Sequence, residues 1–443
     1  MPGTMNDPGW CNLHGAARGV CGSAGRRSTV GTMALGLLLR GVSSLPDPDL
    51  VARVHAFARA RFGGGFVTRN VDEAGRPVLY LDLHPAAEHV ALAFEGHDLE
   101  IAANTSTVGP GYHAHVVDVV DTLAAAFRIT WRHDAEGDVT GYFDNRDFRH
   151  LQQEMLGWLG ALTNAVLPLA SGTVQLALPA THTFESGGHA RTPLGPRERP
   201  WFERVAESPA SGRDFFAWWE KGENAEHYLG VALSLLWTTV RWRPAVSERE
   251  RELRERTFGA LSRARDLDPT LRFPFAEWRE LLTIDGRNRE ADALPRADPA
   301  IPAIGYRRNP VRVSMPGGWS LRIPGNFAEE LDDKGTFCGW HGGRTVWFTS
   351  FRYEGGARTA EEMWGADPDE GEGETFTTGE GAFQSRARLR RVRGGEESDC
   401  WILRTDSALP PQIAICTISF TEDHDRAWAL ETWRSLRHPG HPG

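Results

Sequence analysis

The sequence predicts a multi-domain α+β protein: an N-terminal α+β module with an antiparallel sheet, a helical, tryptophan-rich middle, and a C-terminal antiparallel sheet with a closing helix. Three observations predict this class. The 443 residues are too many for one ordinary hydrophobic core. The 40% apolar and 24% charged residues are typical of globular proteins. The apolar spacing is mixed, then helical, then strand-like along the chain.

These changes divide the chain into five segments. They are a disordered or low-complexity tail at 1–44, an α+β module at 45–194, a helical module at 195–293, a linker at 294–309 and a β-rich α+β module at 310–443. Residues 1–32 are rich in Gly, Ser, Ala and Arg without periodicity, which is typical of a disordered tail. Met33 is a possible alternative start, so whether residues 1–32 belong to the native protein is left open. The apolar run at 33–39 is short and ends at Arg40, so we expect no signal peptide.

In the first module, Val51, Val54, Ala58 and Phe62 share one side of a helix that three glycines end. Short strands are expected next, and the apolar spacing then becomes helical again. The strands lie at 66–71, 78–83, 90–95 and 99–104, the helix at 113–127, a strand pair at 127–133 and 139–143, and a further helix at about 145–162.

The middle module is predicted to hold a long apolar helix at 225–240, which Pro244 ends. Ser247 and Glu250 have the spacing of a capping box at the start of the next helix, which stops at Asp268. The third module is strand-rich. Its expected strands are 311–315, 319–324, 345–353, 386–393, 400–405 and 413–420, followed by a helix at 425–437 with Ala429, Trp433 and Leu436 on one face.

The third module carries a family resemblance. A strand leading into VSMPGGWSLRIP, several further strands, and a last strand running into a helix that ends in RSLR resemble the PsbP-like and DcrB-like α+β family over about residues 310–438. The acidic stretch DPDEGEGE and the lack of a lipobox cysteine depart from that family. Its members are mostly non-enzymatic, so the resemblance implies a binding or chaperone role.

Composition and charge exclude several classes of function. The net charge of −10 and the lack of a basic cluster with interleaved aromatics argue against nucleic acid as a partner. We expect no membrane segment, because no apolar run approaches the roughly 18 residues that one needs. The five cysteines are widely spaced without zinc-site spacing, which suits a reducing compartment and a cytoplasmic location. Cys416 is expected to be a buried structural thiol.

The stretch NTSTVGPGYHAH at 104–115 is the most chemistry-like in the chain. A strand would place His113 and His115 on one face, whereas a helix places them on different sides. The apolar spacing after the pair predicts a helix, with His113 towards the apolar face and His115 towards solvent. Thr107 or Gly109 would cap it, with Pro110 in its first turn. An anion, small-molecule or metal site at this helix start stays open as the alternative, and Tyr112 is a binding candidate.

Other candidate motifs are weak. His133, His150, His182 and His189 lie at irregular distances, and no GxSxG occurs, so we predict no metal site and no cofactor. DPDEGEGE at 367–374 has Gly371 where an EF-hand needs Asp or Asn, and is expected to be a solvated acidic insert. The aromatic residues at 215–242 are expected mainly in a core. Trp218 and Trp219 cannot point the same way, so one of them is a candidate for exposure, and both join Trp319 as binding candidates.

The leading hypothesis is a non-enzymatic, cytoplasmic protein-recognition module, with an adaptor, chaperone or immunity-type role. Its expected partner is another protein, with neither nucleic acid nor membrane involved. One alternative is a hydrolase-like or metal-dependent enzyme with its site at 104–115, where His113 or His115 serves as general base or ligand. A further alternative is a carbohydrate or small-molecule binder. The sequence leaves the partner's identity and the oligomeric state open.

Overall fold

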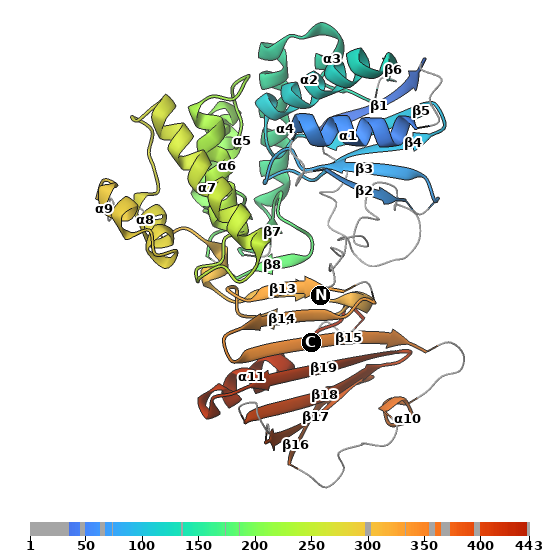
Figure 1. The fold of residues 1–443 in the computed structure, drawn as a ribbon, viewed down its shortest axis with the longest axis vertical. Helices are drawn as coiled ribbons and strands as arrows, with labels where there is room; N and C mark the ends of the chain where they lie inside the picture. The colour runs from blue at the N-terminus through green and yellow to red at the C-terminus, as the bar shows by residue number, and fades with distance from the viewer. Residues whose placement is uncertain are drawn as a thin grey trace, which may run out of the picture.

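The computed structural model describes residues 35–44, 49–62, 67–72, 74–133, 136–172, 174–185, 187–296, 303–332, 334–353, 359–364, 373–393 and 399–440. Their helices and sheets form the multi-domain α+β arrangement that the sequence predicts (Figure 1). Three hydrophobic cores lie in the N-terminal module, among the middle helices and in the C-terminal module. No helix of the described residues is long and apolar enough to cross a membrane.

The N-terminal module contains a six-stranded antiparallel sheet in the order β2-β3-β4-β5-β1-β6. Burial alternates along β1, β4 and β5, so one face of the sheet carries the core. Helices α1 and α2 contribute to this core, where Phe57 of α1 meets Phe127 of α2 edge to face with ring centroids 5.4 Å apart. The elements are β1 (Gly36–Ser43), α1 (Leu50–Phe62), β2 (Val67–Val71), β3 (Pro77–Leu81), β4 (Val90–Glu95), β5 (Asp98–Asn104), α2 (Pro110–Phe127) and β6 (Ile129–Arg132).

The structure corrects two predictions in this module. The predicted tail at 1–44 contains β1, which lies between β5 and β6 and buries Leu37 and Leu39 in the core. The predicted strand at 139–143 is instead a turn followed by α3 (Tyr142–Asn145). The cause of the second difference is Asp138, whose carboxylate accepts hydrogen bonds from the backbone N–H groups of Thr140 and Phe143 and so stabilises a turn.

The first core extends beyond the predicted boundary at residue 194. Helix α4 packs with α5 and η3, and the core continues to Trp218. Short strands connect α4 to α5. These elements are α4 (Phe148–Val166), β7 (Val174–Gln175), β8 (His182–Phe184), β9 (Ala190–Thr192), β10 (Gly195–Arg197), α5 (Arg199–Glu207) and η3 (Pro209–Phe215).

The middle helices have a core of their own around α6 (Ala225–Thr238) and α7 (Glu248–Leu267), with α8 (Phe275–Ile284) and α9 (Asn288–Ala293) packed beside them. Ser247 caps α7, because its side chain accepts a hydrogen bond from the backbone N–H of Glu250. The carboxylate of Glu250 does not complete the predicted capping box. It accepts instead from Arg243 and from the backbone N–H of Val246.

The predicted linker at 294–309 is largely structured where it is described, although residues 297–302 lie outside the described chain. The short helix η4 (Tyr306–Arg308) buries Tyr306, whose ring lies 5.0 Å from that of Phe184 and 4.9 Å from that of Trp237. The Tyr306 hydroxyl donates to the backbone oxygen of Thr192. Tyr306 therefore contacts residues that come before and within the middle helices.

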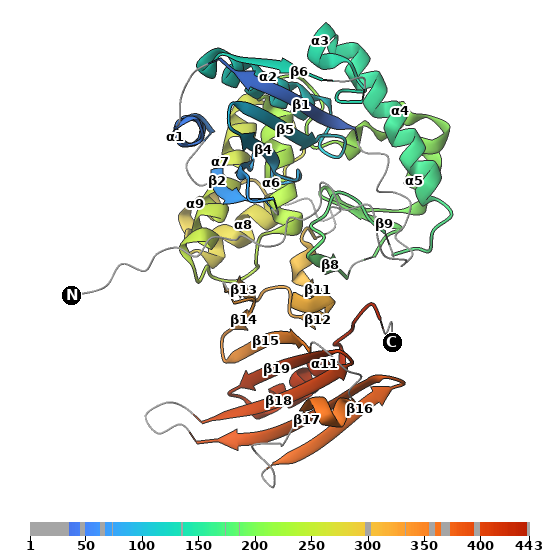
Figure 2. The ribbon, with the colours of Figure 1, turned by 90° about the vertical axis from the view of Figure 1, so that its right-hand side faces the viewer.

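The C-terminal module begins with β11 (Val311–Ser314), η5 (Pro316–Gly318) and β12 (Ser320–Ile323), and β11 also pairs with β8 (Figure 2). A seven-stranded antiparallel sheet follows in the order β13-β14-β15-β19-β18-β17-β16. Its elements are β13 (Ala328–Leu331), β14 (Phe337–His341), β15 (Arg344–Arg352), α10 (Ala360–Trp364), β16 (Glu374–Glu380), β17 (Phe383–Val392), β18 (Cys400–Leu409), β19 (Gln412–Phe420), η6 (Asp423–Asp425) and α11 (Arg426–Arg434).

The two faces of this sheet differ. Helix α11 covers the inner face, where Ala429, Trp433 and Leu436 are buried as predicted and Trp433 Nε1 donates to Ser385 Oγ. Successive residues of a strand point to opposite faces. Arg386 therefore lies on the other side, and its guanidinium is 5.0 Å from the Trp364 ring of α10. Helix α10 thus lies on what we call the outer face. Cys416 is buried in the inner core, as predicted.

Candidate functional site

Helix α2 begins at Pro110 with Gly109 as its N-cap, which is one of the two caps that the sequence predicts. Segment 216–220 lies directly on this helix start. Trp218 N donates to Val108 O at 2.9 Å, and Gly111 N donates to Trp218 O at 3.0 Å. A Cβ on Gly109 would come within 2.6 Å of Trp218 O, and one on Gly111 within 2.3 Å of Glu220 O. The Gly-Pro-Gly sequence therefore permits this close backbone contact.

His113 is fully buried in a polar network. Its Nδ1 lies 2.8 Å from Thr105 Oγ1, and its Nε2 lies 3.4 Å from Thr140 Oγ1 and 3.6 Å from Asp138 Oδ1. Burial alone would raise the pKa of Asp138, but the hydrogen bonds from His113, Phe143 N and Thr140 outweigh burial and lower it. The ring is 0% exposed. Through its contacts with Thr105 and Thr140, it joins the start of α2 to the turn before α3.

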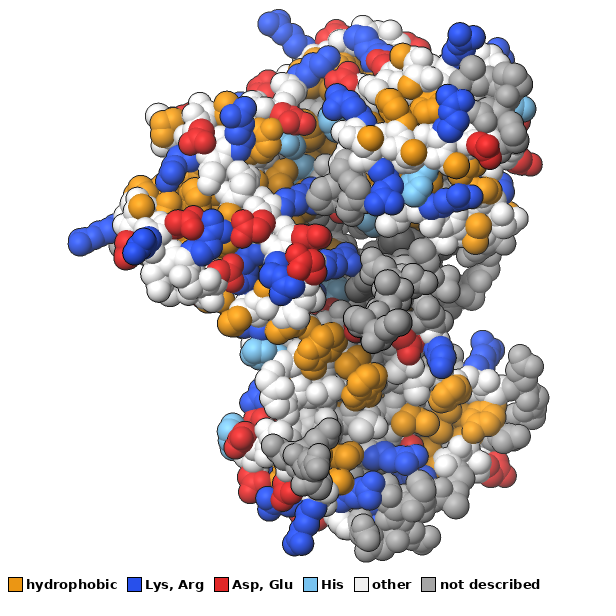
Figure 3. All heavy atoms as spheres, in the orientation of Figure 1, with side chains coloured by type: hydrophobic (Ala, Val, Ile, Leu, Met, Phe, Trp, Pro, Cys, Tyr) orange, Lys and Arg blue, Asp and Glu red, His pale blue; other side chains and the backbone are white. Residues whose placement is uncertain are grey.

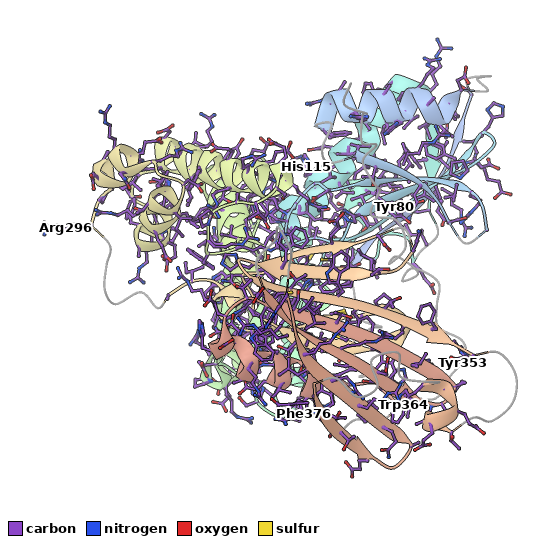
Figure 4. All side chains as sticks on the ribbon, turned by 60° about the horizontal axis from the view of Figure 1, so that its bottom comes forward. Tyr80, His115, Arg296, Tyr353, Trp364 and Phe376 are labelled. Carbon is purple, nitrogen blue, oxygen red and sulfur yellow. The ribbon has the colours of Figure 1, made fainter. Side chains whose placement is uncertain are left out.

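His115 lies on a different side of α2, as helical spacing predicts, but it does not face open solvent. It is half-buried, and its ring centroid is 5.1 Å from that of Trp218. Figure 4 shows His115 where the α6–α7 pair meets the N-terminal module. The expectation of a solvent-facing His115 was wrong because segment 216–228, which is distant in sequence, covers this side of the helix.

Three histidines and two large aromatic residues meet here, and we call them the junction cluster: His84, Tyr112, His115, Trp218 and His227. Trp218 is central, with its ring centroid 3.8 Å from His227 and 6.2 Å from His84. The rings of His84 and Tyr112 are 6.0 Å apart. His84 comes from the β3–β4 loop and His227 from the first turn of α6. Sequence reasoning identified Tyr112, His115 and Trp218 but missed His84 and His227, for which no local motif gives a signal.

The junction cluster is uncharged at neutral pH. Burial lowers the pKa of His84 well below its ordinary value, lowers that of His115, and lowers that of His227 to about 4. His84 Nδ1 accepts a hydrogen bond from Ala86 N at 3.1 Å, so neutral His84 carries its proton on Nε2. That Nε2, the Tyr112 hydroxyl and His227 Nδ1 are buried and have no protein partner in the described chain.

The lowered pKa values predict that the protein loses stability in acid. The unfolded chain takes up these protons as the pH falls below 6.5, whereas folded His227 takes one up only near pH 4. For His227, which is 7% exposed, this difference corresponds to about 3 kcal/mol of stability, which is lost between pH 6.5 and 4. Urea unfolding across this range should show a shallower pH dependence for His227→Gln than for the wild type. His97→Gln, at an exposed site, should leave the slope unchanged, and an equal slope in all three proteins would refute the prediction.

The other binding candidates lie apart from the junction cluster. Trp219 is half-buried beside Phe216, with its ring 5.7 Å from the Arg213 guanidinium. Trp319 is buried in the C-terminal core, 4.9 Å from the His438 ring, and lines a cavity of about 340 Å³. The structure therefore groups Tyr112 and Trp218 and places Trp319 in another module. Of the acidic stretch 367–374, residues 367–372 lie outside the described chain.

Metal-ligand geometry is not found among the described residues, where no group of three or more His, Cys, Asp or Glu side chains could hold an ion. Of the other histidines, His182 belongs to a buried ionic cluster. Its Nε2 lies 2.7 Å from Glu329 Oε2, while Arg307 Nη1 lies 2.6 Å from Glu329 Oε1. Burial alone would raise the pKa of Glu329, but Arg307, His182 and Arg241 outweigh burial and hold it well below its ordinary value. No motif in the sequence indicates this cluster.

The outer face of the C-terminal sheet exposes large apolar side chains. Trp347 is 49% exposed and Phe351 55% exposed, and both lie on β15 with the same orientation because they are four residues apart. Figure 3 shows hydrophobic side chains over β14 and β15. In the strand register, Trp347 is opposite Thr417 of β19, Thr417 is opposite Arg404 of β18, and Arg404 is opposite Arg388 of β17. These residues form one row across the outer face. The outer face is thus apolar on β15 and basic on β17 and β18.

No family model matches the chain, and no curated protein is similar enough to match. A crystal structure of a protein from Bacteroides thetaiotaomicron is similar at 14% sequence identity and a TM-score of 0.23. The likeness covers 29% of this chain and 47% of that one, so this chain spans less than half of that protein's length. The functional inferences therefore rest on the residues of this chain alone.

Proposed function

We propose that this protein is a non-enzymatic recognition module that binds another protein through the outer face of its C-terminal sheet. The observation that carries the proposal is the exposure of Trp347 and Phe351 on one face of β15. Tryptophan is enriched at the centre of protein interfaces, where it buries a large area at a small cost in conformational entropy. The PsbP-like and DcrB-like resemblance and a cytoplasmic location are part of the same proposal.

The chain itself suggests what kind of partner fits. Helix α10 lies on the outer face with Ala360 and Met363 buried beneath it and the acidic Glu361 and Glu362 exposed. Tyr353 donates a hydrogen bond to Met363 O, so the helix is also held by its backbone. A short amphipathic helix therefore already packs on this face. On the same face, β15 presents Trp347 to solvent.

The basic residues of the outer face further restrict the class of partner that fits it. Arg404 lies on the outer face, in the row of the strand register that contains Trp347 and Thr417. A basic side chain in the same row as the exposed Trp347 favours acidic groups on the partner surface that covers it. We therefore propose that the partner contributes an amphipathic helix whose apolar side covers Trp347 and Phe351 and whose acidic residues lie towards Arg404.

Site-specific crosslinking tests the proposal. A photoreactive phenylalanine analogue at position 347 of the full chain should form an adduct in the native cell, and mass spectrometry would identify the protein and the crosslinked segment. The same analogue at Val246, which is 48% exposed in the middle module, is the control. We expect the adduct only from position 347 and expect the captured segment to be an acidic amphipathic helix.

Affinity measurements with the purified partner complete the test. Trp347→Ser and Phe351→Ser should each weaken binding by about 30-fold, which corresponds to the roughly 2 kcal/mol of an interface hot spot. Val246→Ser should bind like the wild type. Unchanged binding by Trp347→Ser, or adducts that form equally from positions 347 and 246, would refute the proposal.

A further inference from the structure

A cavity of about 510 Å³ opens between the middle helices and the C-terminal module. Trp242, Glu280 and Arg308 contribute one side of its wall, from the segment after α6, from α8 and from η4 respectively. The other side includes Arg322 of β12, Arg344 of β15 and Trp428 of α11. We call this cavity the arginine cleft. Its volume lies within the roughly 300–1,000 Å³ of small-molecule sites.

The wall of the arginine cleft is rich in guanidinium groups. Four guanidinium groups line it, those of Arg307, Arg308, Arg322 and Arg344, against the carboxylates of Glu280 and Glu431. Arg308 is neutralised by Glu280, with contacts of 2.9 and 2.5 Å, and Arg307 by the buried Glu329. Arg322 and Arg344 are also paired, with Glu185 and Asp425, but they stay 40% and 35% exposed, so the N–H donors that a ligand can reach belong mainly to these two.

These two arginines are held in place but keep donors to spare. Arg322 Nε donates to Glu185 Oε2 at 2.8 Å, and Arg344 Nη2 donates to the carboxylate of Asp425. A guanidinium has five N–H donors. Within the described chain, the remaining N–H groups of both residues have no acceptor, and the side chains are 40% and 35% exposed. Arg322 also lies directly opposite Arg312 in the β11–β12 register, which adds positive potential.

Aromatic rings orient two of the guanidinium groups. The Arg344 guanidinium lies 5.1 Å from the Trp428 ring, and that of Arg308 lies 3.5 Å from the Trp242 ring. Nε1 of each indole is buried without an acceptor among the described residues. Because these indole nitrogens are buried, the donors that a ligand in the cleft can reach are the N–H groups of the partly exposed Arg322 and Arg344. A ligand rich in acceptor oxygens matches them.

We propose that the arginine cleft binds a small phosphate monoester, with the phosphate between Arg322 and Arg344 and the organic group in the rest of the cavity. A phosphate has three terminal oxygens and can accept from both guanidinium groups at once, which a carboxylate does less well. The two arginines belong to β12 and β15, and the opposite wall belongs to α8 and η4. The ligand would bridge the middle helices and the C-terminal module. This inference is independent of the partner-binding proposal.

Calorimetric titration of the full chain tests the ligand class with four probes: AMP, inorganic phosphate, citrate and adenosine. We expect AMP to bind at one site, inorganic phosphate to bind more weakly, and adenosine not to bind. At about 10 mM probe even a Kd of about 1 mM gives near saturation. Failure of both AMP and inorganic phosphate at that concentration would overturn the proposal. Binding of adenosine as tight as that of AMP, or tighter binding of citrate than of both phosphates, would do the same.

Three variants that each change the net charge by −1 locate the site. Arg322→Gln removes a proposed ligand contact, and Asn326→Asp adds a negative charge to the cleft wall. Arg434→Gln removes a charge from exposed α11 outside the cleft. We expect at least about tenfold weaker AMP binding for the first two and wild-type binding for the third. If Arg322→Gln does not fold, Asn326→Asp decides. Equal affinities of the cleft variants and Arg434→Gln would mean an adventitious ion only and overturn the proposal.

Discussion

Replacing Glu329 with glutamine is expected to lower the free energy of unfolding by about 3–5 kcal/mol. The Glu329 side chain is 6% exposed, and its carboxylate is the anion that Arg307 and Arg241 share. Arg307 is itself 6% exposed, so the substitution leaves a buried guanidinium without its counter-charge. The amide would also place its NH₂ group towards Arg307 or His182, where only an acceptor suits the neighbouring N–H groups.

Glu330→Gln is the matched control, because Glu330 is the next residue of β13 and is exposed. Urea unfolding of the two variants should differ by at least about 3 kcal/mol at pH 7. The double variant Glu329→Gln with Arg307→Met should recover part of the loss, because it removes the unpaired charge. Equal stability of the two single variants would show that Glu329 is not the central anion of this cluster.

Truncating Trp218 to alanine should cost about 3–5 kcal/mol of stability. The ring is 1% exposed and contacts both His115 and His227, and its Nε1 donates to Gly222 O at 3.0 Å. Loss of the ring leaves a cavity between α2 and α6. The backbone of segment 216–220 cannot close that cavity, because it already touches Gly109 and Gly111.

The neighbouring Trp219 provides the control for this experiment. It is half-buried on the surface beside Arg213, so Trp219→Ala should cost about 1 kcal/mol. Chemical unfolding followed by circular dichroism would measure both variants without relying on tryptophan fluorescence. Similar losses for the two substitutions would contradict the central position given to Trp218.

Local patterns in the sequence predicted most of the secondary structure. The strands β2 to β5, the helix α1 and the buried face of α11 follow from apolar periodicity and from turn or cap residues, which act within a few positions. The helical reading of 113–127 also followed from periodicity. It separated His113 from His115 correctly, although the predicted surroundings of His115 were wrong.

The rest could not be predicted because it depends on contacts between distant segments. The strand β1 has no local signal beyond a short apolar run, and its partners are β5 and β6. The buried position of Tyr306 depends on Phe184 and Trp237. The junction cluster brings together His84, Tyr112 and His227, which no motif spacing connects. Tertiary packing therefore decided the places where the local reading failed.

The position of β1 has a consequence for synthesis on the ribosome. Gly36–Ser43 leaves the exit tunnel before its hydrogen-bonding partners at Asp98–Asn104, which are made about 60 residues later. At roughly 5–20 residues per second, an apolar strand waits for several seconds with both edges open. During that interval it is a target for chaperones and for pairing with the same strand of another nascent chain. The length of that interval is thus set by the speed at which the codons between β1 and β5 are translated.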